Sequence, residues 1–441
     1  MKWILGTLAV LLLGLVLQLS FLVYAMYVLL GILLLSRFFT RSWTENIEAG
    51  RHASGEIFEI GQSIDLVVQV QNRGSLTIPW LIIEDSLPLA AMKEKSQRIK
   101  LDGARLQLVR LKPGETATLE YSIEFLTRGY YQLGPVLLET GDVFGLHRRF
   151  RVASEPHFAL VLPKVLALEG YNLASRRPMG EIRVVHRLFE DPTRLAGVRP
   201  YQMGDPLNRI HWRATARTGE LHSRIYETSR VAGATFLLDF HANSYLGAGG
   251  TASAELAIVA VASLANAVFL MGQQVGLVSN GRDAADRIRG EGWRAEFLTR
   301  ADAQSRAADL LENDRLRPVR VETRKGTEKM HQILETLARL EHTDGLEFSE
   351  MLAAAISQIP RDATVVPVLR QVTEPIAIAL GEMVRRGFLV TVVVVAFDQD
   401  PVPDWAKPPD WAELLLAHGI DFRMVNSEEA IMNLCAAAIV R

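Results

Sequence analysis

The chain has 441 residues, more than a single hydrophobic core usually organises, so two or three domains are expected. Its formal net charge of −2 gives no whole-chain attraction to nucleic acid or to an acidic membrane surface. The single cysteine, Cys435, excludes an intrachain disulfide and a cysteine-based zinc site, which is compatible with a reducing compartment.

Residues 1–40 are predicted to form a transmembrane hairpin. No charged side chain occurs from Trp3 to Ser36. As one helix this run would measure about 51 Å, whereas the hydrocarbon core of a bilayer is only about 30 Å thick. Two short spans joined near Gln18 therefore fit better than one steeply tilted helix. Residues 3–36 are expected to lie in the lipid bilayer.

The charges beside this run predict its orientation. Arg37 and Arg41 follow it directly, and positive residues stay on the cytoplasmic side of a membrane. With one span or with two, the soluble domains are expected in the cytoplasm. A cleaved signal peptide fits less well, because the run is too long and lacks a small-residue cleavage site. A buried core hairpin also fits less well, because soluble proteins seldom carry so long an uncharged run.

Residues 45–165 are predicted to form a β-sandwich. Short runs that alternate apolar and polar residues recur here, and turn residues such as Asn72-Arg73-Gly74 separate them. Short strands with this spacing are typical of two packed antiparallel sheets. The strands are expected at residues 64–70, 80–84, 106–111, 116–125, 130–138 and 158–162.

Residues 233–441 are predicted to form a doubly wound α/β domain, because strands and helices alternate. Residues 388–397 have the near-continuous apolar pattern of a parallel strand buried on both faces. The arginine-rich residues 281–326 show no clear period and are expected to cross the domain surface as a long excursion. The other strands are expected at residues 235–239, 275–279, 364–369 and 421–425, and helices at 252–271, 327–340, 375–386, 409–417 and 428–439.

The segment between these domains, residues 166–232, has the most unusual composition. Residues 176–230 contain 11 arginines, no lysine and 6 acidic residues. Arginine without lysine favours planar, bidentate partners such as carboxylates and phosphates, or stacking on aromatic rings. Gly204-Asp205-Pro206 is typical of a tight turn, which presents Asp205 for structural pairing with an arginine of the same segment.

Four interpretations of this segment stay open. It is either a network of ion pairs that joins the two domains or a docking surface for a partner protein, since Arg, Tyr and Trp are the usual anchors of interfaces. A catalytic site with His211 as base and Asp205 as its orienting acid has no nucleophile motif nearby. Nucleic-acid binding has only faint support from the positive charge of the segment, so no nucleic-acid partner is expected.

The same segment carries a resemblance to a known family. The pattern Arg199-x-Tyr201-x-x-Gly204-Asp205-x-x-x-Arg209-Ile210-His211-Trp212, followed by Ala216-Arg217, resembles the signature of the domain of unknown function fifty-eight family. Upstream, residues 128–135 and 142–146 resemble the sandwich of that family. The motif residues expected to bind a partner are Arg199, Tyr201, Gly204, Asp205, Arg209, His211, Trp212 and Arg217.

The resemblance implies a multi-domain α+β protein: a membrane hairpin, a β-sandwich and a von Willebrand A-like α/β domain. It implies a multi-pass protein of the bacterial inner membrane. The expected partners are a MoxR-type AAA ATPase and other von Willebrand A-domain proteins. Because the family has no established catalytic activity, the leading hypothesis is a non-enzymatic adaptor or scaffold in complex assembly or in an envelope or stress function.

The metal site that the resemblance implies is degenerate in this chain. A metal-competent von Willebrand A domain has Asp-x-Ser-x-Ser after its first strand, whereas here the sequence is Asp239-Phe240-His241-Ala242-Asn243. Where a second acid is expected, Arg370 places a positive charge. Magnesium prefers oxygen ligands in an octahedral array. We therefore expect no metal at Asp239, His241 and Asn243 and no other cofactor; the alternative role for Asp239 and His241 is to cap the edge of the sheet.

Two other classes of function stay open. A hydrolase-type enzyme would use the crevice at the strand ends. In that case Asp239, His241, Asn280 and Asp398 would have to meet within hydrogen-bonding distance in a concave pocket. A structural component of an envelope complex is the third class. An adaptor, in contrast, requires an exposed surface around Arg199, Arg209 and Trp212.

Overall fold

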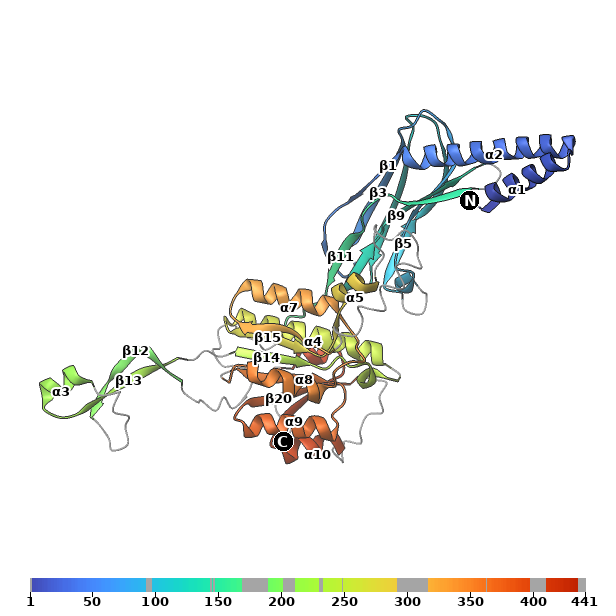
Figure 1. Cartoon of the computed structure of the whole chain (residues 1–441). Coiled ribbons are helices and arrows are strands. Elements are labelled where there is room, and N and C mark those ends of the chain that lie inside the picture. The colour runs from blue at the N-terminus through green and yellow to red at the C-terminus, as the bar shows by residue number, and fades with distance from the viewer. Residues whose placement is uncertain are drawn as a thin grey trace. The chain divides into compact units, whose positions relative to one another are not determined.

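The structure is a computed structural model with a mixed α+β architecture, in which apolar helices at the N-terminus precede several β-sheets (Figure 1). It describes residues 2–92, 97–142, 145, 147–168, 189–200, 211–229, 233–247, 249–291, 316–361, 363–396 and 410–434. The chain divides into two compact units. Unit 1 comprises Met1–Lys164, Arg282–Asp314 and Glu335–Glu341, and unit 2 comprises Val165–Gly281, Arg315–Leu334 and His342–Arg441.

Two apolar helices begin unit 1. They are α1 (Lys2–Val16) and α2 (Ser20–Glu45), and the turn between them contains Gln18, which has a φ of 52°. Residues other than glycine seldom adopt a positive φ, and an α-helix requires a negative one, so α1 cannot continue through Gln18 as a regular helix. The break predicted near Gln18 from the length of the uncharged run is confirmed.

Two helices in the described part of the chain are long and apolar enough to cross a membrane, α2 and α4 (Gly250–Leu270). Of the apolar stretch of α4, 78% is buried inside the protein, so α4 is a core helix of unit 2. The corresponding value for α2 is 11%, which makes α2 the better candidate for a span. Its 26 residues measure roughly 39 Å, which is longer than a hydrocarbon core of about 30 Å.

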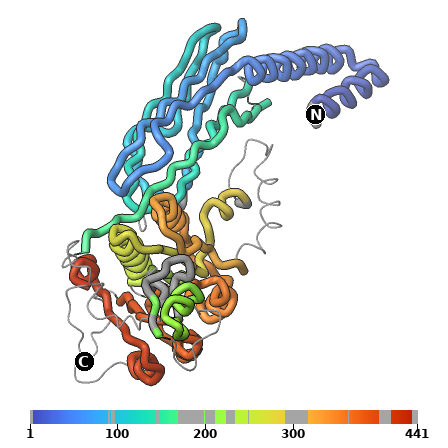
Figure 2. Tube along the Cα trace, turned by 90° about the vertical axis from the view of Figure 1, so that its left-hand side faces the viewer, coloured from blue at the N-terminus to red at the C-terminus, as the bar shows by residue number. Residues whose placement is uncertain are grey.

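The C-terminal half of α2 packs against the strands of unit 1 (Figure 2). The Ser36 hydroxyl donates a 2.7 Å hydrogen bond to the carboxylate of Asp142. The Arg151 guanidinium donates to the carbonyl oxygens of Thr44 at 2.9 Å and Ile47 at 3.0 Å, beside the last turn of the helix. The buried residues of α2 are Leu33, Ser36, Thr40, Trp43 and Thr44.

The strands of unit 1 form two four-stranded sheets around one hydrophobic core, a β-sandwich, together with a three-stranded sheet. The orders are β1-β3-β7-β5, β10-β9-β4-β6 and β2-β11-β8. In β3, buried and more exposed residues alternate along the whole strand, as its sequence predicted. The strands are β1 (Ile47–Ala53), β2 (Ile57–Glu59), β3 (Ser63–Asn72), β4 (Ile78–Asp85), β5 (Ile99–Gly103), β6 (Leu106–Leu111), β7 (Thr116–Phe125), β8 (Gly129–Leu133), β9 (Val136–Gly141), β10 (Arg148–Val152) and β11 (His157–Leu162).

The single strand predicted at residues 130–138 is wrong, because Gly134 and Pro135 divide it into β8 and β9, which join different sheets. Proline has no N–H to donate to a sheet. A Cβ atom at Gly134 would also collide with the guanidinium of Arg51. The strands β1, β2, β5 and β10 were missed, because their sequences have weak alternation.

A buried ion pair lies inside the sandwich. The guanidinium of Arg51 (β1) pairs with the carboxylate of Asp85 (β4), and both side chains are almost fully buried. The Tyr121 hydroxyl donates a 2.6 Å hydrogen bond to the same carboxylate, and Arg51 also donates to the carbonyl of Leu133 at 2.6 Å. Burial raises the pKa of Tyr121, and the neighbouring Asp85 raises it further, so this hydroxyl remains a donor.

Arg128, in the upstream motif, is buried and holds a second part of unit 1 in place. Its guanidinium donates to the carbonyl oxygens of Leu337 at 2.7 Å and Leu340 at 3.0 Å. Leu337 lies in the last turn of a helix, α7 (Thr327–Arg339), where carbonyl oxygens lack a partner within the helix and a positive side chain is favourable; Leu340 follows the helix directly. The rest of this part consists of α5 (Ala284–Glu291) and the short paired strands β16 (Arg282–Asp283) and β18 (Leu340–Glu341).

Unit 2 contains a six-stranded sheet with the order β17-β15-β14-β19-β20-β21. All neighbouring strands are parallel except β17, which is antiparallel to β15. In chain order the strands therefore run 3-2-1-4-5-6, the doubly wound order. The strands are β14 (Gly233–Leu238), β15 (Gln274–Ser279), β17 (Val319–Arg324), β19 (Thr364–Leu369), β20 (Leu389–Val395) and β21 (Asp421–Val425).

Helices cover this sheet. α4 packs against β14 and β15, and the apolar side chains of α8, α9 and α10 share one core with Leu237, Val365 and Val392 of the strands. The helices are α7 (Thr327–Arg339), which continues into unit 1, α8 (Phe348–Ala355), α9 (Glu374–Arg385), α10 (Asp410–Ala417) and α11 (Glu428–Met432). The interpretation of residues 281–326 as a surface excursion without regular structure is wrong for β16, α5 and β17. β17 is an edge strand in which one side chain is buried and the others are half-buried or exposed. α8 was also missed.

Candidate functional site

The described residues of the central motif lie on a two-stranded ribbon with a short helix, which we call the arm. It consists of β12 (Phe189–Pro200), α3 (Trp212–Thr218) and β13 (His222–Ser229). Among the described residues, β12 and β13 pair only with each other, antiparallel, with Arg199 opposite Ser223. Tyr201, Gly204, Asp205 and Arg209 lie outside the described residues, and so does the pairing predicted for Asp205.

His211 has a structural role at the start of α3. Its ring Nδ1 accepts the N–H of Ala214 at 3.0 Å, which satisfies a free donor in the first turn. Its backbone N–H donates to the carbonyl of His222 at 2.8 Å and so ties the helix to β13. Gly219 ends the helix in the left-handed conformation, with a φ of 77°.

The surface of α3 combines an aromatic ring with positive charge. Trp212 is 65% exposed, and Arg213 and Arg217 are exposed beside it on the same helix. Neither arginine forms an ion pair among the described residues. Leu221 and Val198, on the neighbouring parts of the arm, are also exposed. Most of the Trp212 side chain is therefore open to solvent, and the alternative in which it is buried between domains stays a prediction.

The second candidate site is the strand-end network around Asp239, directly after β14. The carboxylate is 1% exposed. One oxygen accepts hydrogen bonds from the amide of Asn280 at 2.9 Å and from the backbone N–H of His241 at 3.2 Å. The other accepts the hydroxyl of Ser244 at 2.6 Å. Both oxygens are therefore satisfied by donors of the same domain.

Asn280 and Tyr245 extend this network. The side-chain oxygen of Asn280 accepts the N–H of Phe240 at 2.7 Å, and its amide also donates to the carbonyl of Leu346 at 3.1 Å. The Tyr245 hydroxyl donates to the backbone carbonyl of Asp239 at 2.9 Å. These bonds fix the loops after β14 and β15 to each other. The arrangement is that of a closed cap at the edge of the sheet.

The residues predicted for this crevice meet only in part. Asp239 and Asn280 are hydrogen-bonded, but the ring of His241 accepts the N–H of Asn243 at 3.2 Å and does not point to the carboxylate. Asp398 lies outside the described residues. Arg370 donates to the carbonyl of Leu246 at 2.9 Å, in the same group of loops. In the described part of the chain, no three His, Cys, Asp or Glu side chains gather as metal ligands would.

Sequence reasoning missed Ser244, which makes the shortest hydrogen bond to Asp239, at 2.6 Å. The Asp-x-Ser-x-Ser pattern places its two hydroxyl residues two and four positions after the aspartate. The hydroxyl that bonds to Asp239 belongs to Ser244, five positions after it. Ser244 lies on a short 3-10 helix, Ala242–Tyr245, which turns its side chain back toward β14. His342 was also missed; its ring stacks on Phe240 with centroids 4.3 Å apart. A polar residue within one turn of a strand-end aspartate was the available signal.

Comparison with known proteins places residues 197–301 in a match to a family model described as "Protein of unknown function DUF58". This range contains the second half of the arm and the residues around Asp239. The uncharacterized protein YeaD of Bacillus subtilis (strain 168) is 24% identical over 243 residues. The match spans 54% of this chain and 57% of that relative, so this chain covers little more than half of the relative's length.

Solved structures match about a quarter of the chain at low similarity. The CARDB domain of PF1109 from Pyrococcus furiosus is 15% identical, with a TM-score of 0.17, over 26% of this chain and 94% of that domain. The alpha-2-macroglobulin of E. coli is 14% identical, with a TM-score of 0.21, over 28% of this chain and 7% of that protein. Similarity at this level supports no inference about function.

Proposed function

We propose that this protein is a membrane-anchored, non-enzymatic adaptor that docks a MoxR-type AAA ATPase in the cytoplasm through its arm. In this proposal the N-terminal hairpin holds the chain in the bacterial inner membrane. The α/β domain, of the von Willebrand A-like kind, carries the arm and contacts further proteins with such domains. The protein and its ATPase act together in complex assembly or in an envelope or stress function.

The observation that carries the proposal is the exposure of Trp212. Tryptophan and arginine are the residues that most often dominate the binding energy of protein interfaces. Here a ring that is 65% exposed lies beside Arg213 and Arg217, and nothing within the described part of the arm covers it. A large apolar side chain left in water is costly, so a partner that buries it gains affinity. Arginines at the rim supply bidentate bonds to carboxylates of that partner.

The closed network around Asp239 supports an adaptor over a hydrolase. Every side-chain polar atom of Asp239 and Asn280 is engaged in holding loops together. A general base needs a free lone pair aimed at a substrate proton, and the carboxylate of Asp239 is enclosed by its own donors. The strand order 3-2-1-4-5-6 with an aspartate after the first strand supports the von Willebrand A-like assignment.

The docking proposal is tested by co-purification of the ATPase with the full chain from gently solubilised membranes. We expect Trp212→Ala to reduce the recovered ATPase at least tenfold, and the double variant Arg199→Ala, Arg209→Ala to reduce it strongly. Arg361→Ala, which removes an exposed arginine elsewhere in unit 2, is the matched control and keeps full recovery. If folded arm variants retain full binding, the docking hypothesis fails and the arm has only a structural role.

The proposed membrane topology has its own test. The side chains of α2 before Arg37 are largely exposed, among them Phe21, Tyr24 and Val28, as lipid-facing residues would be. We expect a reporter fused after Arg441 to be active when it is one that works only in the cytoplasm. Activity of a reporter that works only outside the cytoplasm, fused at the same position, contradicts this topology.

A further inference from the structure

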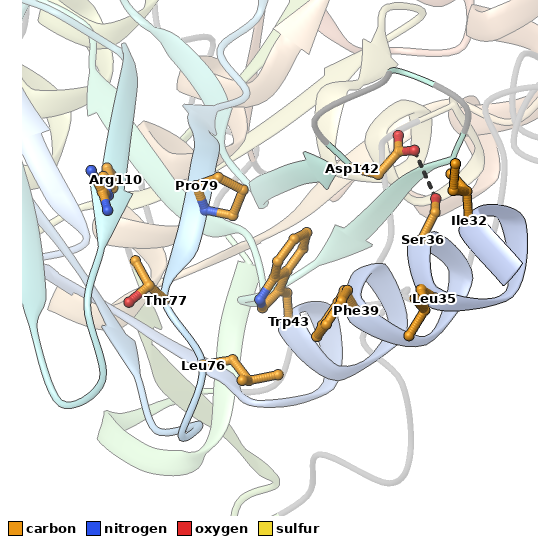
Figure 3. A pocket seen from close by; sticks show the side chains of 10 residues that line it. All are labelled: Ile32, Leu35, Ser36, Phe39, Trp43, Leu76, Thr77, Pro79, Arg110 and Asp142. Carbon is orange, nitrogen blue, oxygen red and sulfur yellow. Dashed lines mark hydrogen bonds between the residues drawn. The ribbon is translucent and has the colours of Figure 1, made fainter. Parts of the chain in front are cut away.

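A pocket of about 460 Å³ lies between α2 and the sandwich, within unit 1 (Figure 3). Its volume is in the range of roughly 300–1,000 Å³ that is usual for small-molecule sites. One wall is a stripe of α2 at helical spacing that includes Leu35, Phe39 and Trp43, and the facing wall includes Leu76 and Pro79. The pocket is therefore mainly apolar and open on one side, a shape suited to a hydrocarbon chain.

The pocket wall contains a polar group without a partner. Trp43 is 9% exposed and is part of the sandwich core, but its indole N–H makes no hydrogen bond among the described residues. Buried donors are nearly always paired, so an unpaired one at a pocket is a candidate contact for a ligand with an acceptor oxygen. Phe39 stacks on the same ring, with centroids 5.7 Å apart, and fixes its orientation.

The exposed charge at the pocket is positive, whereas its negative charge is buried. Asp142 lines it, but the carboxylate is occupied: one oxygen accepts the Ser36 hydroxyl at 2.7 Å and the other accepts the His147 backbone N–H at 3.0 Å. Arg110, on β6, is exposed and has no ion pair among the described residues. An arginine beside an apolar pocket favours a ligand with a hydrocarbon tail and an anionic head, and its planar donors suit a phosphate.

The position of the pocket along α2 indicates where that ligand comes from. Ile32 and Leu35 belong to the uncharged run, while Phe39 and Trp43 follow Arg37, the first charge after it. The pocket therefore extends across the boundary at which the apolar part of α2 ends. Aromatic and basic residues at such a boundary are typical of the bilayer interface, at the level of lipid headgroups.

We propose that this pocket binds one anionic phospholipid of the surrounding membrane. An acyl chain lies against Leu35, Phe39 and Trp43, and the phosphate pairs with Arg110. This rests on the proposed insertion of α2 into the bilayer. Binding adds a lipid contact to the junction of helix and sandwich, so the proportion of anionic lipid in the membrane controls how firmly the two are held together.

The test is native mass spectrometry of the full chain in a neutral detergent, titrated with phosphatidylglycerol or with phosphatidylcholine. We expect one bound phosphatidylglycerol per chain at a lipid concentration at least tenfold lower than phosphatidylcholine requires. Arg110→Gln should reduce this difference to less than threefold. Arg148→Gln is the matched control, because it removes an exposed arginine from the same sheet but outside the pocket. It should leave the tenfold difference unchanged.

Equal binding of the two lipids, or an unchanged preference in Arg110→Gln, overturns the proposal. Thr77→Phe places a ring in the pocket and should abolish the bound lipid at an unchanged melting temperature; retained binding overturns the proposal. If that variant does not fold, Leu35→Ser on the exposed side of α2 should weaken the binding of both lipids, and unchanged binding is the contrary result. Alkaline carbonate extraction tests the anchor separately: a chain that stays in the membrane but shows no lipid preference refutes only the pocket.

Discussion

The strand-end network around Asp239 and the arm around Trp212 fall within the same family match, yet they use their side chains in opposite ways. At the strand end, each side-chain polar atom of Asp239 and Asn280 bonds to a neighbour in the same domain. On α3, a large ring and two arginines face solvent. The difference shows that a polar cluster at the carboxyl ends of strands is not enough to identify a working site. Exposed aromatic and charged side chains are the better indicator, and here they lie on the arm.

The largest expected effect is the loss of the Asp239 carboxylate. Asp239→Ala leaves the donors of Ser244, Asn280 and His241 buried without an acceptor, at a cost of about 2–4 kcal/mol. For a domain of this size, that lowers the melting temperature by roughly 5–15 °C. Thermal unfolding of the full chain in detergent measures it. A melting temperature within 2 °C of the wild type, a difference of about 1 kcal/mol or less, means that the network does not hold the loops together.

A smaller effect is expected at Ser244. Ser244→Ala removes one hydrogen bond to a buried carboxylate whose other oxygen stays paired, so the expected destabilisation is about 1–2 kcal/mol. Ser42→Ala, at a half-buried serine on α2, is a control with no bond to a carboxylate. An effect of Ser244→Ala as large as that of Asp239→Ala contradicts the proposed division of the network. It would show that the serine hydroxyl is the main partner.

Trp212→Ala tests the comparison at the arm. Because the ring is mostly exposed, its removal should change the stability of the free protein by less than about 0.5 kcal/mol. The same variant should lose most of the bound ATPase. A large fall in melting temperature without the ATPase would contradict the exposed position of the ring and the docking proposal that depends on it.

The smallest expected effect is that of divalent cations. Both carboxylate oxygens of Asp239 are engaged with protein donors, and the position of a second acid is taken by Arg370. Calorimetry with magnesium and manganese on the full chain in detergent should therefore show no saturable heat. A micromolar isotherm that disappears in Asp239→Ala would mean that the cation displaces Ser244 and Asn280. The closed network would then be the resting form of a metal site.

The sequence predicted features that depend on length and period. The helix break at Gln18 follows from the mismatch between an uncharged run and the thickness of a bilayer, and β20 follows from consecutive apolar residues. β17 was missed because an edge strand needs little apolar surface. α8 was missed because its N-cap is Glu347, whereas the capping-box signature in a sequence starts with Ser, Thr, Asp or Asn; the box that Glu347 and Glu350 form at the start of the helix is seen only in the structure.

The candidate sites were less predictable. Which donors reach Asp239 depends on how the loop after β14 turns, and Ser244 arrives through a short 3-10 helix that has no periodic signal. Likewise, composition marks Trp212 as an unusual residue but does not state its exposure. Whether a ring is covered is decided by tertiary packing. The lipid pocket could not be predicted from the sequence at all, because it requires α2, β4 and β6 to come together.

The continuity of α2 has a mechanical consequence. The helix runs without interruption from Phe21 in its apolar part to Trp43 in the sandwich core, and Arg151 clamps its last turn. The helix contains no break between these two residues that could act as a hinge. In a bilayer that becomes thinner, a helix of fixed length must tilt further, and the sandwich fixed to its end must rotate by the same angle. On the proposal that α2 spans the bilayer, a change in membrane thickness would therefore move the sandwich together with the helix.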